Sequence, residues 1–118
     1  MNMPNDSELK VMDVLWSEGD TSARRIAEVL CRATGWQKNT TYTLINRLIA
    51  KQLIERIEPG FMCRALIMRE QVQQREADAL VDKLFSGSAS LLFSALVSGK
   101  KLPRQELDKL SRMIDEMK

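Results

Sequence analysis

The chain has 118 residues, of which 44% are hydrophobic and 29% are charged, a composition typical of a folded rather than a disordered protein. It carries a net charge of +2 and no histidine, which excludes a histidine-based metal site or general base. No apolar run is long enough to span a membrane, and the N-terminus lacks the basic and apolar regions of a signal peptide. We expect a cytoplasmic protein, without membrane insertion, that forms one domain or two small units.

Two amphipathic helices are predicted near the N-terminus. Ser7 is a good N-cap for the first helix, which should end near Gly19. The apolar side of this helix consists of Leu9, Met12, Leu15 and Trp16. Residues 20–22 cap the second helix, and Thr34 and Gly35 end it. The apolar positions of the second helix follow the spacing i, i+3, i+4 and i+7, and they are Ala23, Ile26, Ala27 and Leu30.

A third helix within residues 36–54 carries the strongest functional signal in the chain. One face is an apolar stripe typical of a half-buried helix, made of Thr41, Leu44, Ile45 and Leu48. The opposite face has short hydrogen-bonding side chains, one arginine and no acid, and consists of Asn39, Thr40, Thr43, Asn46, Arg47 and Ala50. Carboxylates on a helix that reads base edges would repel phosphates, so their absence favours a DNA-reading helix. The alternative is an ordinary surface helix that happens to be poor in acids.

Charge is distributed unevenly around these helices. Residues 1–20 carry five acidic residues against Lys10, whereas residues 21–51 carry six basic residues against Glu28. A basic block that covers two consecutive predicted helices is the pattern expected where a protein contacts phosphates.

Two short strands follow the third helix. Residues 53–58 and 61–66 flank Pro59-Gly60, which predicts a hairpin. Because Pro-Gly favours a type II turn over the primed hairpin turns, we expect a slightly longer loop. Three helices followed by a hairpin is the order of a winged helix-turn-helix domain, which we assign to residues 1–68 of a mostly α chain.

Residues 69–118 are predicted to form a helical dimerisation domain. Helical stretches at 68–84 and 89–97 and a last helix beginning near Pro103 are too short to bury their apolar faces alone. Folding back onto the winged domain is one solution; self-association is favoured, because such DNA readers usually work as symmetric dimers. The expected interface residues, several at the spacing of a coiled-coil seam, are Leu80, Leu84, Leu107, Leu110, Ile114 and Met117.

Several segments occur in a distinctive order and spacing: Glu8-Leu-Lys-Val-Met-Asp-Val-Leu-Trp16, Thr21-Ser-Ala-Arg-Arg-Ile-Ala27, Gly35 to Thr40, Thr43 to Leu48, Lys51 to Ile54, Phe85 to Gly87 and Leu102 to Leu110. In this order and spacing they resemble the penicillinase-repressor family of bacterial transcription regulators (the BlaI/MecI/CopY type). The resemblance implies a homodimeric winged-helix repressor on a palindromic operator in double-stranded DNA. It also implies relief of repression by cleavage in the C-terminal domain, triggered by a membrane-bound metalloprotease sensor for β-lactams or by a similar signal.

The predicted recognition helix departs from the family pattern at its two ends and at Tyr42. Gln37 and Lys38 stand where the family has Ser-Pro or a similar cap, which gives a weaker cap and one more positive charge. Tyr42 occupies a position that is often basic or polar. Gln52 stands where Gly is common, so this helix needs another way to end.

The C-terminal half also departs from the family pattern. The cleavable Asn-Phe bond of the β-lactam repressors aligns with Ala95–Leu96, which is therefore the candidate cleavage bond. The copper-responsive branch uses a C-terminal cysteine cluster, and no cysteine follows Cys63 in this chain.

We expect the third helix to enter the major groove of DNA. The residues expected at base edges are Asn39, Thr40, Tyr42, Thr43 and Asn46. Lys38 and Arg47 should lie nearer phosphates, and an A/T-containing half-site is plausible because Asn prefers adenine and Thr can meet a thymine methyl. Arg56 and Arg64, on the two hairpin strands, should contact the backbone without sequence choice; the alternative is that both pair with Glu55 or Glu58.

The remaining residues point to no enzyme, cofactor or metal site. No phosphate loop, nucleophile elbow or paired acid arrangement is visible. Cys31 and Cys63 match neither a zinc nor a disulfide pattern and are expected to be small buried hydrophobes. Beside the DNA-binding repressor, two alternatives stay open: a helical module for protein interaction and assembly, and a thiol-responsive regulator that uses Cys31 or Cys63.

Overall fold

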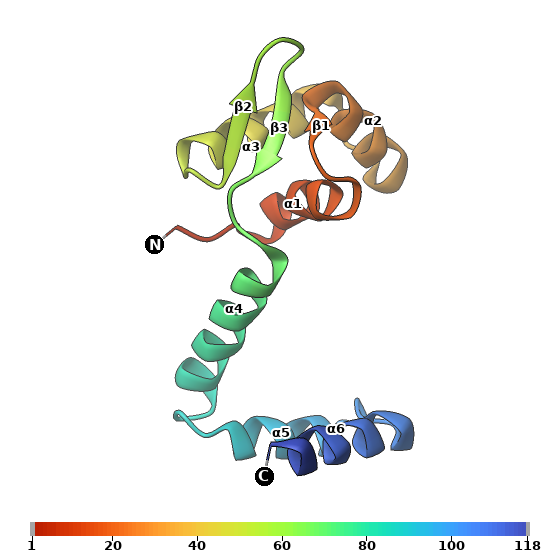
Figure 1. Cartoon of the computed structure of the whole chain (residues 1–118), viewed down its shortest axis with the longest axis vertical. Coiled ribbons are helices and arrows are strands. Elements are labelled where there is room, and N and C mark those ends of the chain that lie inside the picture. The colour runs from red at the N-terminus through yellow and green to blue at the C-terminus, as the bar shows by residue number, and fades with distance from the viewer. Residues whose placement is uncertain (1, 118) are drawn as a thin grey trace. The chain divides into compact units, whose positions relative to one another are not determined.

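The computed structural model describes residues 2–117 and confirms the predicted fold class, a mostly helical chain with a winged helix followed by further helices (Figure 1). The elements are α1 (Asp6–Glu18), β1 (Thr21–Ser22), α2 (Ala23–Thr34), α3 (Lys38–Ala50), β2 (Ile54–Ile57), β3 (Met62–Ala65), α4 (Arg69–Leu84), α5 (Ala89–Ser98) and α6 (Arg104–Glu116). They form two compact units, residues 1–74 and residues 75–118.

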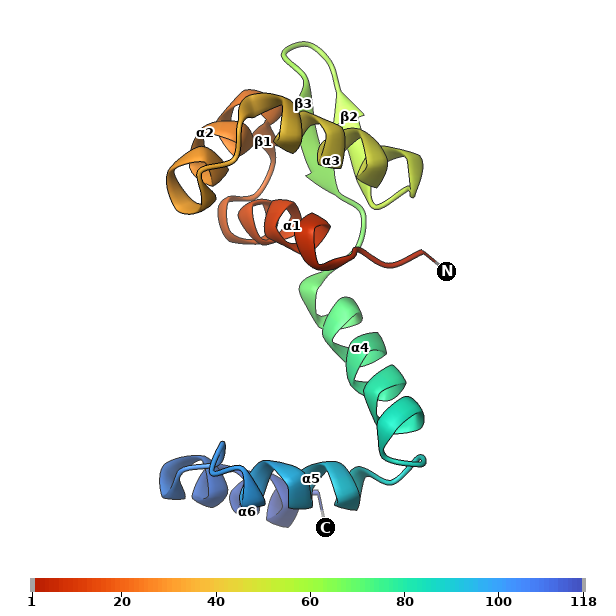
Figure 2. The same cartoon turned by 180° about the vertical axis from the view of Figure 1, so that it is seen from behind.

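The first unit buries one core between α1, α2, α3 and a small antiparallel sheet, and the tip of the hairpin projects beyond the helices (Figure 2). The predicted stripes of α2 and α3 are confirmed, because their buried residues are Ala23, Ile26, Ala27, Leu30, Thr41, Leu44, Ile45 and Leu48. The strand order is β1-β3-β2. The sequence did not predict β1, which is only two residues long and pairs Thr21 with Cys63.

Helix α1 begins earlier than predicted. Its N-cap is Asn5, not Ser7. The Glu8 N–H donates to Asn5 Oδ1 (2.8 Å), and the Asn5 N–H donates to Glu8 Oε1 (2.9 Å). This reciprocal capping box satisfies two N–H groups at once, which Ser7 could not have done with a partner three residues later, because that partner is Lys10.

Helix α3 ends in a Schellman motif despite the absence of glycine. The Leu53 N–H donates to the Leu48 carbonyl (2.9 Å), and the Gln52 N–H donates to the Ile49 carbonyl (3.0 Å). Gln52 adopts the left-handed conformation that this motif requires, with φ of 63°. Leu48 and Leu53 are both buried in the core, and this apolar contact holds the motif closed.

The predicted wing is present, with each strand one residue shorter at either end than the sequence pattern indicated. Ile54 pairs with Ala65 and Ile57 pairs with Met62, so residues 58–61 form the connection. The prediction of a loop longer than two residues around Pro59-Gly60 is therefore confirmed.

The second unit differs from the first in how deeply it buries the residues described. Within residues 75–117 no residue is buried, whereas the first unit buries sixteen hydrophobic residues. Helix α4 begins in the first unit, where Val72 is buried in the core. No single helix within residues 2–117 is long and apolar enough to cross a membrane.

The left-handed Gln52 generates a prediction about stability. A Cβ in this conformation costs roughly 1–2 kcal/mol, and glycine removes that cost at the expense of chain entropy, so Gln52→Gly should raise the free energy of unfolding by about 0.5–1 kcal/mol. Gln52 is exposed, so no packing is lost. Urea unfolding of the two proteins measures the difference. Gln52→Ala keeps the Cβ and should give no gain; equal stabilisation by both substitutions would show that conformational strain at residue 52 is not the cause.

Candidate nucleic-acid interface

The polar face of α3 is exposed along its whole length. Packing of the buried stripe leaves Asn39, Thr40, Thr43, Asn46 and Arg47 on the solvent side. The Thr43 hydroxyl donates to the Asn39 carbonyl (2.9 Å) one turn earlier in the same helix. No acid lies on this helix, so the face offers donors, acceptors and methyl groups without a negative charge.

The basic block around α3 divides into paired and unpaired cations. The ion pairs are Arg24–Glu28, Arg25–Glu18 and Lys51–Glu8. Within residues 2–117, no ion pair involves Arg32, Lys38 or Arg47. Lys38 and Arg47 lie at opposite ends of α3, so a phosphate could approach either without first breaking an ion pair.

Tyr42 connects α3 to the wing. Its ring is half-buried and meets the Phe61 ring edge to face, with 5.8 Å between centroids and an interplanar angle of 88°. The Lys38 ammonium lies 5.4 Å from the centroid of the Tyr42 ring, within the range of a cation–π contact. Of the residues expected at base edges, Tyr42 is thus the one whose side chain is partly engaged inside the protein.

Phe61 is a structural centre that the sequence did not reveal. The Arg56 guanidinium lies 3.7 Å from the centroid of the Phe61 ring. The Phe61 carbonyl accepts from the Ala23 N–H (2.9 Å) at the start of α2. Phe61 adopts a positive φ of 48°, an uncommon conformation for a bulky residue. In the sequence, the one feature that pointed to a special role for Phe61 was its position directly after Pro59-Gly60.

The two wing arginines lie on opposite faces of the hairpin. Arg56 stands opposite Cys63 in the ladder and Arg64 stands opposite Glu55, and side chains that stand opposite share a face. Because neighbouring residues alternate between faces, one arginine points to each side of the wing.

Both wing arginines are paired with acids. Arg56 forms an ion pair with Glu58, which is the alternative considered from the sequence. Arg64 donates to Asp20 Oδ2 from Nε (3.0 Å) and Nη2 (2.8 Å), so its partner is neither Glu55 nor Glu58. These hydrogen bonds lower the pKa of Asp20 and the pKa of Glu58, so both acids stay charged well below neutral pH.

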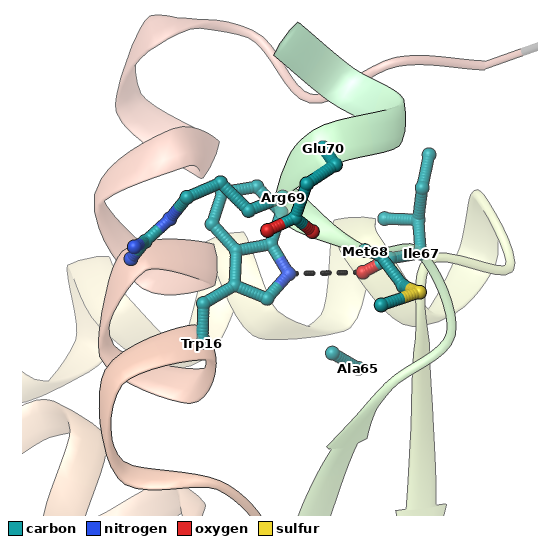
Figure 3. Close-up of a pocket in the computed structure, with 6 residues that line it drawn as sticks. All are labelled: Trp16, Ala65, Ile67, Met68, Arg69 and Glu70. Carbon is teal, nitrogen blue, oxygen red and sulfur yellow. Dashed lines mark hydrogen bonds between the residues drawn. The ribbon is translucent and has the colours of Figure 1, made fainter.

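A pocket of about 310 Å³ lies where the chain leaves β3 and enters α4 (Figure 3). Its lining residues are Trp16, Ala65, Ile67, Met68, Arg69 and Glu70. The Trp16 indole N–H donates to the Ile67 carbonyl (2.9 Å), and the Arg69 guanidinium lies 5.5 Å from the indole ring. Trp16 therefore ties the start of α4 to α1.

The two cysteines differ, and the expectation that both are buried is wrong for Cys31. Cys63 is fully buried in the core, and burial raises the pKa of its thiol to about 11. Cys31 is exposed on α2, because it follows the buried Leu30 and points away from the core. It lines a pocket of about 230 Å³ with Arg24, Ala27, Glu28 and Lys38.

The residues predicted at a dimer interface lie in α4 and α6, except Met117, which is the C-cap of α6, and most are exposed. The exposed fractions are 40% for Leu80, 64% for Leu84, 53% for Ile114 and 85% for Met117. Leu107 and Leu110 are half-buried. The candidate cleavage bond, Ala95–Leu96, lies inside α5.

Comparison with known proteins gives a consistent pattern over nearly the whole length of the chain. The penicillinase repressor family matches residues 5–116. The methicillin resistance regulatory protein MecI of Staphylococcus aureus (strain N315) is 24% identical over 114 residues, which cover 95% of this chain and 93% of that protein. The penicillinase repressor of Bacillus licheniformis is 21% identical, with 97% and 91% covered, and that of Staphylococcus aureus is 23% identical, with 94% and 90% covered.

The contrast between the cysteines generates a prediction about thiol reactivity. The thiolate is the reactive form, so at pH 8 the native protein should lose one thiol to Ellman's reagent, and that thiol is Cys31. The pKa of Cys63 lies near 11, so its thiolate is scarce until the pH rises through that value. Absorbance of the released product counts the thiols. Cys31→Ser should leave none reactive until urea is added, and rapid reaction of native Cys31→Ser would contradict the burial of Cys63.

Proposed function

Because the chain belongs to the penicillinase repressor family, a family of transcriptional repressors, we propose that it is a homodimer that binds a palindromic operator in double-stranded DNA. In this proposal residues 1–68 are the DNA-binding domain and residues 69–118 are the dimerisation domain. The protein acts by binding and not by catalysis, as is general for such repressors.

The observation that carries the proposal is the exposed, acid-free face of α3, with a cation at either end that forms no ion pair within residues 2–117. An α-helix of this kind fits the major groove. The residues that face base edges are Asn39, Thr40, Tyr42, Thr43 and Asn46. Lys38 and Arg47 contact phosphates, and Asn and Thr side chains favour a half-site that contains A·T pairs. A protein-interaction surface would have no reason to exclude acids from this face, which disfavours the assembly module.

The wing adds contacts that do not depend on sequence. Arg56 and Arg64 lie on opposite faces of the hairpin, so a wing that enters a groove presents one arginine to each wall. Both arginines exchange an exposed acid for a phosphate when DNA binds. Exposed ion pairs contribute little to stability, so this exchange is feasible.

The second unit supports self-association. Its apolar side chains include several that are 40% exposed or more: Leu80, Leu84, Leu91, Phe93, Val97, Met113, Ile114 and Met117. A monomer rarely leaves so many apolar side chains in water, and a two-fold partner presents the same apolar faces in return. Two linked reading heads also gain affinity, because the second half-site is bound at a high effective concentration.

Cleavage in residues 86–101 is the proposed route of relief, with Ala95–Leu96 as the candidate bond and a membrane-bound metalloprotease sensor system as the partner. The DNA-binding unit has its own core and survives the cut, whereas the link between the two heads is lost. Because the bond lies in a helix of only ten residues, α5 has to unwind locally before a protease can bind it in extended form.

Thiol-responsive regulation is a second candidate, favoured by the exposure of Cys31 in a pocket that Lys38 also lines. Alkylation of Cys31 that abolishes operator binding in the parent but leaves Cys31→Ser unaffected would support it.

The placement of α3 generates a prediction for Arg47. A lost phosphate contact weakens binding to all sequences alike and lowers the slope of log K against log salt by about one. Arg47→Ala should show both effects in a fluorescence anisotropy titration at several salt concentrations. The matched control is Lys10→Ala, which removes the same charge from an exposed position of α1 and should leave the slope unchanged. Parent-like affinity of Arg47→Ala across the salt series would exclude this placement.

The second unit generates a prediction for Leu110. Each buried Leu contributes roughly 1.5–3 kcal/mol, and symmetry doubles the effect of a substitution. Leu110→Asp places an unpaired carboxylate in each half of the interface, so the variant should sediment as a monomer and bind the operator more weakly. Gln105→Asp adds the same charge on the opposite face of α6 and should stay dimeric. A dimeric Leu110→Asp with full operator affinity would assign the C-terminal helices another role.

A further inference from the structure

We propose that Lys51 and Glu8 form a positioning pair that fixes the recognition helix α3 in its DNA-reading orientation, and that Lys51 is not a phosphate contact. This inference rests on the proposed function of α3. It removes Lys51 from the DNA-binding surface, although the basic block of the sequence includes it, and it gives Glu8 a role in sequence discrimination.

The pair joins the end of one helix to the start of another. Lys51 is the C-cap of α3, and its ammonium lies 2.5 Å from Glu8 Oε1, in the first turn of α1. The Glu8 side chain is fully buried, whereas the Lys51 side chain is 30% exposed. Lys51 also donates to the Met3 carbonyl (3.2 Å), so the N-terminal segment is held at the same point.

A single buried oxygen organises this junction. Glu8 Oε1 accepts both from Lys51 and from the Asn5 N–H that completes the capping box of α1. The second oxygen, Glu8 Oε2, is buried and has no hydrogen-bond partner within residues 2–117. Lys51 is therefore the one cation described beside a buried carboxylate, and the structure strongly disfavours any position of α3 that separates them.

The pair supplies what the core contacts of α3 lack. The stripe from Thr41 to Leu48 packs through apolar contacts, which have little directional preference and permit small slides or rotations. An ion pair at one end of the helix fixes its position along the axis. The Lys51 N–H donates to the Arg47 carbonyl (2.9 Å), so a shift at Lys51 reaches Arg47 and the neighbouring Asn46 within one turn.

Glu8→Gln separates positioning from charge. If Lys51 served DNA through its charge, removing the acid would free it and raise affinity for every duplex. In the positioning role the ratio of operator to random-duplex affinity falls, by about tenfold if one base contact is lost. Gln is also accepted in a capping box, so α1 keeps its N-terminus and the variant folds.

Lys51→Met and Lys51→Arg complete the experiment. Lys51→Met should lower the same ratio without changing the salt slope, whereas a phosphate contact would lower the slope by about one. Lys51→Arg keeps a cation beside Glu8, so its ratio of operator to random-duplex affinity should stay close to that of the parent. The double variant Glu8→Gln with Lys51→Met should lower the ratio of operator to random-duplex affinity no further than either single variant, because both substitutions remove the same ion pair. Lys10→Met is the control, and thermal unfolding confirms that each titration is made on folded protein.

The possible failures are distinguishable. If the parent protein does not discriminate a selected operator from random duplex, the proposed function fails. If the parent discriminates, and Glu8→Gln and Lys51→Met have the same ratio of operator to random-duplex affinity as the parent, only the positioning role is overturned. The same holds if Glu8→Gln binds every duplex more tightly than the parent does. Should Lys51→Met not fold, Glu8→Gln alone decides the outcome.

Discussion

The orientation of α3 is the constraint on which the rest of the first unit depends. Its four buried side chains decide which face is left for a ligand, because a helix that buries one stripe turns the opposite side toward solvent. One member of the stripe is polar: the Thr41 hydroxyl is buried and has no hydrogen-bond partner within residues 2–117. An unsatisfied buried hydroxyl costs about 1–3 kcal/mol, so the packing of this helix is good enough to offset a local defect.

Much of this fold could be predicted from the sequence, because helical periodicity reports burial directly. The buried residues of α2 and α3 are those at the predicted positions. Local rules were less successful where two signals competed. Ser7 and Asn5 are both good caps, and only the reciprocal bond with Glu8 decides between them. The strand β1 is too short to show an alternating pattern, and it forms because β3 lies beside it.

Only part of the candidate site could be predicted from sequence patterns. The acid-free face of α3 and the presence of Lys38 and Arg47 on this helix follow from residues close together in the chain. The partners of Lys51 and Arg64 lie 43 and 44 residues away, and no local pattern links them. Counting charges along the sequence therefore overestimated the positive charge available to DNA. The assignment of side chains to base edges, phosphates and a dimer interface stays a prediction, because it concerns molecules that the chain alone does not specify.

Phe61 joins the wing to two helices that lie far from it in the sequence. Its ring contacts Tyr42 of α3 and the guanidinium of Arg56 in the wing, and its carbonyl accepts from the N–H of Ala23, the first residue of α2. Displacement of the hairpin would therefore disturb both helices of the helix-turn-helix. The consequence concerns additivity: free energies measured for substitutions in the wing and in α3 will not simply add, because the two elements share this aromatic contact. A double-mutant cycle across Tyr42 and Phe61 would measure how far the wing and the recognition helix behave as one body.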